Sequence, residues 1–244
     1  MIAPYLRRGM AAGLLAGLLA GLFAFVFGEP FVDQSIQIEE AAAAGHHEEV
    51  TSGGQEEEVF SRATQKIGLF FITGLFGVSV GGVFGIAYVY FRGHLASKSE
   101  WNRSLSLAAA LFVGVFLIPF VKYPANPPTV GDPTTIGDRI ASYLAMVVLS
   151  LLVVLAAWYA ARTLRTREVG APIRQLTVGL GGVVMVSVLF LALPAAPDPG
   201  EFPSGLLWNF RLSSLGTQLV FWTGLGVGFG LLCERANRRE PFWS

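Results

Sequence analysis

The sequence predicts an all-α membrane protein: a polytopic helical bundle that crosses the bilayer about six times and forms a single integral membrane domain over residues 1–244. Three observations predict this fold. Hydrophobic residues make up 53% of the chain and charged residues only 14%, too few for the surface of a soluble domain of this length. The apolar residues gather in six stretches that contain no charged residue and no histidine. Basic residues concentrate in alternate connecting segments, as the positive-inside rule requires.

Each of the six stretches is long enough to cross a bilayer as a helix. They cover residues 10–27, 67–91, 105–121, 140–161, 176–193 and 212–233. At about 1.5 Å per residue they reach roughly 26 to 38 Å, against a hydrocarbon core of about 30 Å. The third stretch is the shortest and has Pro119 near its end, so a count of five helices stays open as the alternative.

The first stretch also resembles the start of a secretory signal peptide, because Arg7 and Arg8 precede a run of Leu, Ala and Gly. This stretch is longer than the usual signal core. It ends in Gly28-Glu29-Pro30 rather than in a small-x-small cleavage site. We therefore expect it to be retained as a membrane span.

The distribution of charge predicts a protein of the cell (plasma) membrane with both termini in the cytoplasm. With the N-terminus inside, only five of the 17 basic residues lie outside: Arg62, Lys66, Lys122, Arg139 and Arg211. The acidic residues run the other way, with 13 of 17 outside. The apolar stretches make membrane lipid an expected partner. The formal net charge is zero, so nucleic acid is not expected.

A weak internal repeat suggests three helical hairpins of about 75 residues each. Each expected outer loop contains proline and then an arginine followed closely by Ser or Thr, at Arg62, Arg139 and Arg211. These arginines are 77 and 72 residues apart. The pattern Phe-x-Thr-Gly-Leu also occurs twice, at residues 71–75 and 221–225.

Small residues recur every four positions in the first two stretches. Glycine stands at 9, 13, 17 and 21, alanine at 12, 16, 20 and 24, and glycine again at 77, 81 and 85. Residues four apart share a helix face, and a strip of small residues lets another helix approach closely. The expected role is helix packing, with ion conduction as the alternative.

The expected outer loop at residues 29–66 is acidic and contains two adjacent histidines. We expect Glu29, Asp33, His46 and His47 to contact a metal ion, because imidazole and carboxylate together suit borderline divalent ions such as Co²⁺ and Ni²⁺. A helical continuation would place Glu29 and Asp33 on one side, whereas Pro30 is equally compatible with a turn. The alternative is an acidic loop that is merely solvated.

The sequence indicates no enzyme. It contains no Walker-type phosphate loop, no pairing of nucleophile and base, and no cluster of histidines within the apolar stretches. Its one cysteine, Cys233, excludes an intrachain disulfide framework. No cofactor is expected.

Several polar strings resemble the CbtA family of predicted cobalt transporter subunits over nearly the whole chain. They are Arg8 to Gly17, Gly28-Glu29-Pro30-x-Val32-Asp33, the Gly45 to Glu49 loop, Glu58 to Gln65, Lys122 to Pro128 and Phe210 to Gln218. The resemblance implies a multi-pass, permease-like subunit with cobalt as its transported substrate. It also implies a small partner, CbtB, that carries a histidine-bearing metal motif. The family is described with five helices, whereas the charge pattern here favours six.

Two hypotheses about function follow. The first is a permease-like subunit for uptake of a cobalt- or nickel-class divalent cation, which gathers the ion at an acidic outer face. The second is a non-transporting membrane subunit that assembles a separate permease complex. Nothing in the residues selects Co²⁺ over Ni²⁺.

Overall fold

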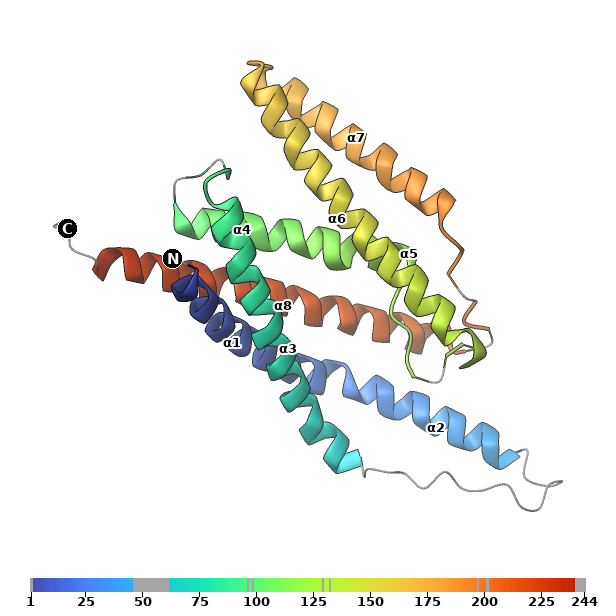
Figure 1. The fold of residues 1–244 in the computed structure, drawn as a ribbon. Coiled ribbons are helices and arrows are strands. Elements are labelled where there is room, and N and C mark those ends of the chain that lie inside the picture. Colours follow the sequence, from blue (N-terminus) through green and yellow to red (C-terminus); the bar gives the residue numbers. More distant parts are fainter. Residues whose placement is uncertain are drawn as a thin grey trace. The chain divides into compact units, whose positions relative to one another are not determined.

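The computed structural model describes residues 2–45, 62–95, 97, 99–128, 130–131, 133–196, 198–200 and 202–239, and all regular structure in these ranges is helical (Figure 1). The helices are α1 (Ala3–Phe27), α2 (Glu29–Gly45), α3 (Arg62–Phe91), α4 (Glu100–Leu111), η1 (Phe112–Leu117), α5 (Ile118–Lys122), η2 (Pro133–Thr135), α6 (Ile136–Thr166), α7 (Ala171–Ala192) and α8 (Ser204–Arg239). The predicted all-α fold is confirmed.

The predicted six membrane spans are also confirmed. Six helical segments of the described chain are long and apolar enough to cross a bilayer: Ala3–Phe27, Thr64–Phe91, Glu100–Lys122, Ile136–Thr166, Ala171–Ala192 and Ser204–Arg238. The third of them is 23 residues long, so the five-helix alternative is not needed. Most helices extend past the charge-free stretches, because charged side chains at helix ends can reach the headgroups while their backbone stays helical.

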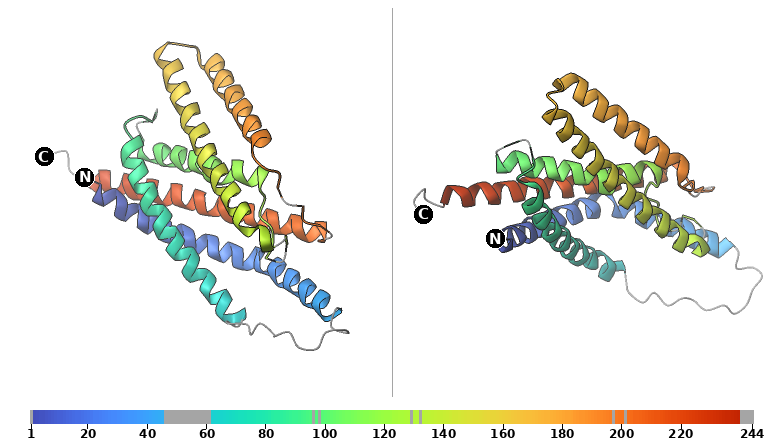
Figure 2. Two further views of the ribbon diagram at one scale, coloured as in Figure 1. Left: turned by 45° about the vertical axis from the view of Figure 1, so that its right-hand side comes forward. Right: turned by 45° about the horizontal axis from the view of Figure 1, so that its top comes forward.

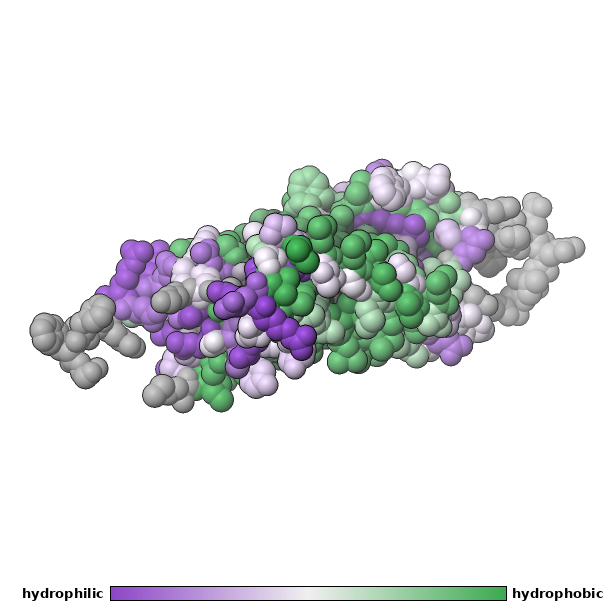
Figure 3. Space-filling model, turned by 90° about the horizontal axis from the view of Figure 1, so that it is seen from above, coloured by the Kyte–Doolittle hydropathy of each residue, from purple (hydrophilic) through white to green (hydrophobic). Residues whose placement is uncertain are grey.

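Apolar side chains cover much of the face shown in Figure 3. Phe71 in α3 is 80% exposed, and Leu191 in α7 is 88% exposed. Large apolar side chains with this exposure require a lipid environment, because contiguous apolar surface of this kind is rare on soluble monomers.

The packing divides the chain into two compact units. Unit 1 comprises Met1–Ala109, Asn126–Thr129 and Phe202–Ser244, and unit 2 comprises Ala110–Ala125 and Val130–Glu201. The single membrane domain and the three repeated hairpins expected from the sequence stay predictions.

In unit 1, the small residues of α1 form two rows that face different helices. The glycine row faces α3, which crosses α1 (Figure 2). A Cβ atom built on Gly13 would lie 2.9 Å from the Cα of Gly81 and would clash with the carbonyl oxygen of Gly77. The alanine row faces α8, where a Cβ built on Gly224 would lie 3.3 Å from that of Ala16.

These contacts support the packing role of the small residues and disfavour conduction along the seam between α1 and α3. Backbone atoms of the two helices meet there, so the seam has no room for an ion.

Ser104 adds a buried hydrogen bond between α4 and α8, donating from its hydroxyl to the carbonyl oxygen of Gly226 at 2.6 Å.

In unit 2, the third span contains the π-helix η1 before Pro119. The N–H of Ile118 bonds to the carbonyl oxygen of Val113, five residues back. The next bond of this kind would join residue 119 to Gly114, but proline has no N–H. The hydroxyl of Ser150 in α6 instead donates to the Gly114 carbonyl oxygen. A side chain from the neighbouring helix thus satisfies the backbone group that proline leaves open.

Ser150→Ala should therefore destabilise the protein by about 1 kcal/mol, since it leaves the Gly114 carbonyl unpaired at membrane depth. The loss of stability caused by Ser150→Ala should be smaller in a chain that also carries Pro119→Ala, because alanine restores the missing N–H. Unfolding of the purified protein in detergent measures both values. The exposed Ser79 hydroxyl bonds within its own helix, so Ser79→Ala serves as the control. Equal losses from Ser150→Ala with and without Pro119→Ala would contradict the compensation.

Candidate functional site

The first candidate site lies where α1 gives way to α2. Gly28 ends α1, with its N–H bonded to the carbonyl oxygen of Ala24 at 2.7 Å. The helix then resumes at Glu29, and Pro30 stands in its first turn, where no intrahelical N–H is required. Of the two conformations left open by the sequence, the helical continuation is the one found. It corrects the interpretation of residues 29–66 as a loop, because α2 occupies residues 29–45.

Glu29 and Asp33 lie on one side of α2 and both pair with the start of α3. Arg62 Nη2 lies 3.0 Å from Glu29 Oε2 and 2.5 Å from Asp33 Oδ1. Lys66 Nζ lies 2.8 Å from Asp33 Oδ2. We call these four residues the Glu29 cluster. It joins two of the polar strings noted in the sequence, at Gly28–Asp33 and Glu58–Gln65.

The Glu29 cluster contains two carboxylates and two cationic groups, so its formal charges balance. Hydrogen bonds from Lys66 and then Arg62 hold the pKa of the Asp33 carboxyl below its ordinary value. The hydrogen bond to Asp33 in turn raises the pKa of Arg62. A metal ion that binds Glu29 and Asp33 must therefore displace Arg62 and Lys66 from them.

The lowered pKa makes the Asp33 ion pairs dependent on pH. A carboxyl with a depressed folded-state pKa stabilises the protein fully above its ordinary pKa, about 3.9, and this contribution is lost as the pH falls through the folded value. Asp33→Asn should therefore lower the thermal midpoint in detergent at pH 7, and the difference from the unmodified chain should shrink towards pH 3. The effect should stay below about 1 kcal/mol, because the pairs are partly exposed. A difference of unchanged size between pH 7 and pH 3 would assign it to packing.

The other two predicted ligands, His46 and His47, lie outside the described residues. Within the described part of the chain, no group of three or more His, Cys, Asp and Glu side chains could hold a metal ion. The metal-contact role of Glu29, Asp33, His46 and His47 stays a prediction.

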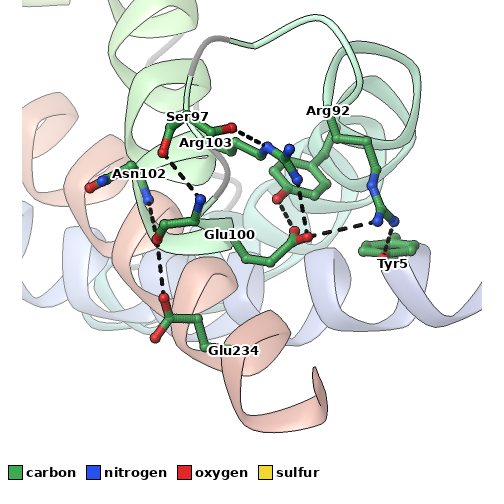
Figure 4. A network of polar contacts seen from close by, with 9 residues as sticks. Tyr5, Arg92, Ser97, Glu100, Asn102, Arg103 and Glu234 are labelled. Carbon is green, nitrogen blue, oxygen red and sulfur yellow. Dashed lines mark hydrogen bonds and ion pairs between the residues drawn. The ribbon is translucent and has the colours of Figure 1, made fainter. Parts of the chain in front are cut away.

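A second polar cluster lies at the opposite end of α1 and was not predicted from the sequence (Figure 4). Glu100, the first residue of α4, accepts a hydrogen bond from the Tyr88 hydroxyl. Arg103 Nη1 lies 3.3 Å from Glu100 Oε1, and Arg92 Nη2 lies 3.7 Å from it. Arg92 also donates to the Tyr5 hydroxyl. We call Tyr5, Tyr88, Arg92, Glu100 and Arg103 the Glu100 cluster.

The Glu100 cluster is internal, since the Glu100 side chain is only 8% exposed. The sequence placed Glu100 in a basic connecting segment, where a solvated side chain is the ordinary expectation. The available signals were weak: an acidic residue in the first turn of a helix, and an arginine three positions later.

Two further polar residues singled out by the sequence have defined partners. Lys122 Nζ donates to the carbonyl oxygen of Phe190 at 2.8 Å, near the C-terminal end of α7, where a cation is favoured by the helix dipole. Arg211 Nη2 donates to Asn126 Oδ1 at 2.9 Å. This second contact joins the polar strings at Lys122–Pro128 and Phe210–Gln218.

The family of this helical chain follows from its similarity to a known family model. The family model described as "Probable cobalt transporter subunit (CbtA)" matches residues 2–234. The chain belongs to the CbtA family. No curated protein and no solved structure matches this CbtA-family chain significantly.

Membership of the CbtA family assigns a role in transport and confirms the resemblance noted in the sequence. With six candidate spans, this CbtA chain is a multi-pass membrane protein. The family description as a subunit is consistent with assembly with further subunits.

Proposed function

We propose that this CbtA chain is a permease-like subunit for uptake of divalent cobalt, or of a closely related cation such as Ni²⁺. The observation that carries the proposal is the family match over residues 2–234. The Glu29 cluster adds support, because its carboxylates lie directly beyond a membrane span on one side of α2. Such a pair offers oxygen ligands to an ion at the mouth of the bundle.

In this proposal the predicted ligands act in sequence. His46 and His47 take up the ion loosely, and Glu29 and Asp33 receive it by exchange with Arg62 and Lys66. Loose binding is required, because a site that held the ion tightly would not release it. The exchange keeps every carboxylate paired with a cation throughout, which avoids like-charge repulsion between Glu29 and Asp33.

The proposal places both termini in the cytoplasm of a plasma-membrane protein, as the basic residues predict. Reporters fused after Phe91 and beyond the end of α6, after Arg167, should then report the cytoplasm. Reporters near Ser52 and Pro128 should report the outside. A reversed pattern at all four positions would invert the bundle and move the Glu29 cluster to the cytoplasmic face.

Metal accumulation tests the function directly. Cells that express this chain should accumulate more Co²⁺ than cells with the empty vector, and co-expression of a small CbtB-type partner should raise accumulation if the partner assists transport. Purified chain in liposomes that enclose a metal-sensitive dye separates the two hypotheses. Entry of Co²⁺ into the liposomes indicates a permease, whereas accumulation in cells without entry into liposomes indicates an assembly subunit.

A further inference from the structure

Glu100 is unusual in its burial. In the part of the chain that the structure describes, it is the one Asp, Glu, Lys or Arg residue that is buried. Removing a carboxylate from water costs several kcal/mol, and a well-packed apolar residue often stabilises a protein as well as a buried ion pair does. Stability alone is therefore a weak reason for Glu100. Glu100 is the first residue of the third candidate span, and ionisable residues of membrane spans often mark a route for ions.

The Glu100 cluster joins helices that converge at one end of unit 1. Tyr5 comes from α1, Tyr88 from the last turn of α3, and Glu100 and Arg103 from α4, while Arg92 directly follows α3. Helix α8 adds Phe229, whose ring centroid lies 4.8 Å from that of Tyr88 and 5.1 Å from that of Phe84. Tyr88, Phe84 and Phe229 are at most 1% exposed. An ionic layer and an aromatic layer together close this end of unit 1.

The contacts of Glu100 can be exchanged without leaving its arginines unpaired. Arg92 also donates to the Tyr5 hydroxyl and lies 5.0 Å from the centroid of the Tyr5 ring. Arg103 Nε donates to the carbonyl oxygen of Ser97 at 2.6 Å. The 3.7 Å separation of Arg92 and Glu100 is longer than a hydrogen bond. Withdrawal of Glu100 therefore leaves each arginine with another acceptor.

We propose that the Glu100 cluster is a gate, shown here closed, and that a divalent cation passes the Glu100 carboxylate on its way through unit 1. An arriving cation would replace the arginines as the partner of Glu100, and the helices would separate at this end. This inference rests on the proposed transport function. The Glu29 cluster and the Glu100 cluster then stand at opposite ends of α1, about 36 Å apart along the helix.

The reactivity of a native cysteine can report whether the Glu100 cluster opens. Cys233 is the only cysteine in the sequence, lies one helical turn beyond Phe229 on α8, and is 1% exposed. A neutral maleimide should therefore alkylate the folded protein slowly. Glu100→Gln and Arg92→Gln should each increase the alkylation rate by about tenfold, the amount expected when a hydrogen bond to a charged group is lost.

The two charge variants distinguish opening of the gate from a purely electrostatic effect on the Cys233 thiol. Glu100→Gln removes a negative charge that acts on the Cys233 thiol, and Arg92→Gln removes a positive charge that acts on it, so a change in thiolate reactivity alone would move the two rates in opposite directions. Opening of a gate would increase the alkylation rate in both variants. Tyr88→Phe keeps the ring and the charges, and it should accelerate labelling even if a charge variant fails to fold.

Ser104→Ala controls for general loosening, because Ser104 makes a buried hydrogen bond between α4 and α8 outside the cluster. Its labelling rate should stay near that of the unmodified chain. Equal rates in the unmodified chain and the cluster variants, opposite effects of the two charge variants, or equal acceleration by Ser104→Ala would each overturn the gate. The labelling needs no metal, so the two failures are distinguishable: Co²⁺ accumulation without accelerated labelling would reject the gate alone, whereas accelerated labelling without Co²⁺ accumulation would reject transport and, with it, passage of a cation at Glu100.

Discussion

Glu29→Gln should depress Co²⁺ accumulation by about tenfold at every external concentration, because it removes charge and a ligand where the ion would enter the bundle. Replacing His46 and His47 by alanine should reduce accumulation mainly at low external Co²⁺, since loose capture matters less when the ion is abundant. A titration of external Co²⁺ in cells that express each variant measures both effects.

The ion pairs of the Glu29 cluster offer a second explanation for a transport defect in Glu29→Gln. The titration must distinguish this explanation from metal binding by Glu29. Glu29 accepts from Arg62 at 3.0 Å, so Glu29→Gln also weakens the attachment of α2 to α3. Arg62→Gln weakens the same attachment while leaving both carboxylates in place. If Glu29 binds the ion, Arg62→Gln should keep or increase accumulation at low Co²⁺. If Glu29 only holds Arg62, the two variants should show the same defect.

Glu39→Gln is the matched control for these variants. Glu39 is exposed and lies further along α2, so its replacement removes the same charge from the same helix away from Arg62 and Lys66. Accumulation should remain near that of the unmodified chain. Equal accumulation by Glu29→Gln and the unmodified chain at every concentration would show that the carboxylates of α2 are structural.

Gly17→Leu should produce the largest loss of stability, on the order of 3 kcal/mol. A Cβ atom at Gly17 would clash with the carbonyl oxygen of Thr73 and would lie 3.1 Å from the Cα of Gly77. These obstacles are backbone atoms of α3, which cannot rotate away as a side chain can. The two helices must separate, and the close contacts along the seam are lost.

Thermal unfolding of the purified chain in detergent measures this loss. Gly68→Leu is the control, because Gly68 lies in α3 and a Cβ built there has no atom within 4 Å. Gly68→Leu should be neutral or slightly stabilising, since leucine has the higher helix propensity. Similar midpoints for Gly17→Leu and the unmodified chain would contradict the close packing of α1 on α3.

The small residues show what sequence periodicity can predict and what it cannot. A spacing of four predicted that the glycines and the alanines of the first span each share a helix face, which is a local property of helix geometry. The partner of each row was not predictable from that spacing. The structure assigns the glycine row to α3 and the alanine row to α8, because only the folded bundle decides which helix approaches which face.

The sequence by itself determined the six membrane spans and the possibility that Glu29 and Asp33 share a side, since hydropathy and helical spacing act within one segment. Only the tertiary structure decided what those charged side chains meet. Arg62 and Glu29 are 33 residues apart, and their pairing depends on how α2 and α3 fold together. Glu100 reads as a solvated residue of a basic segment until Tyr88, Arg92 and Arg103 pack around it, because burial depends on how the helices pack rather than on the local sequence.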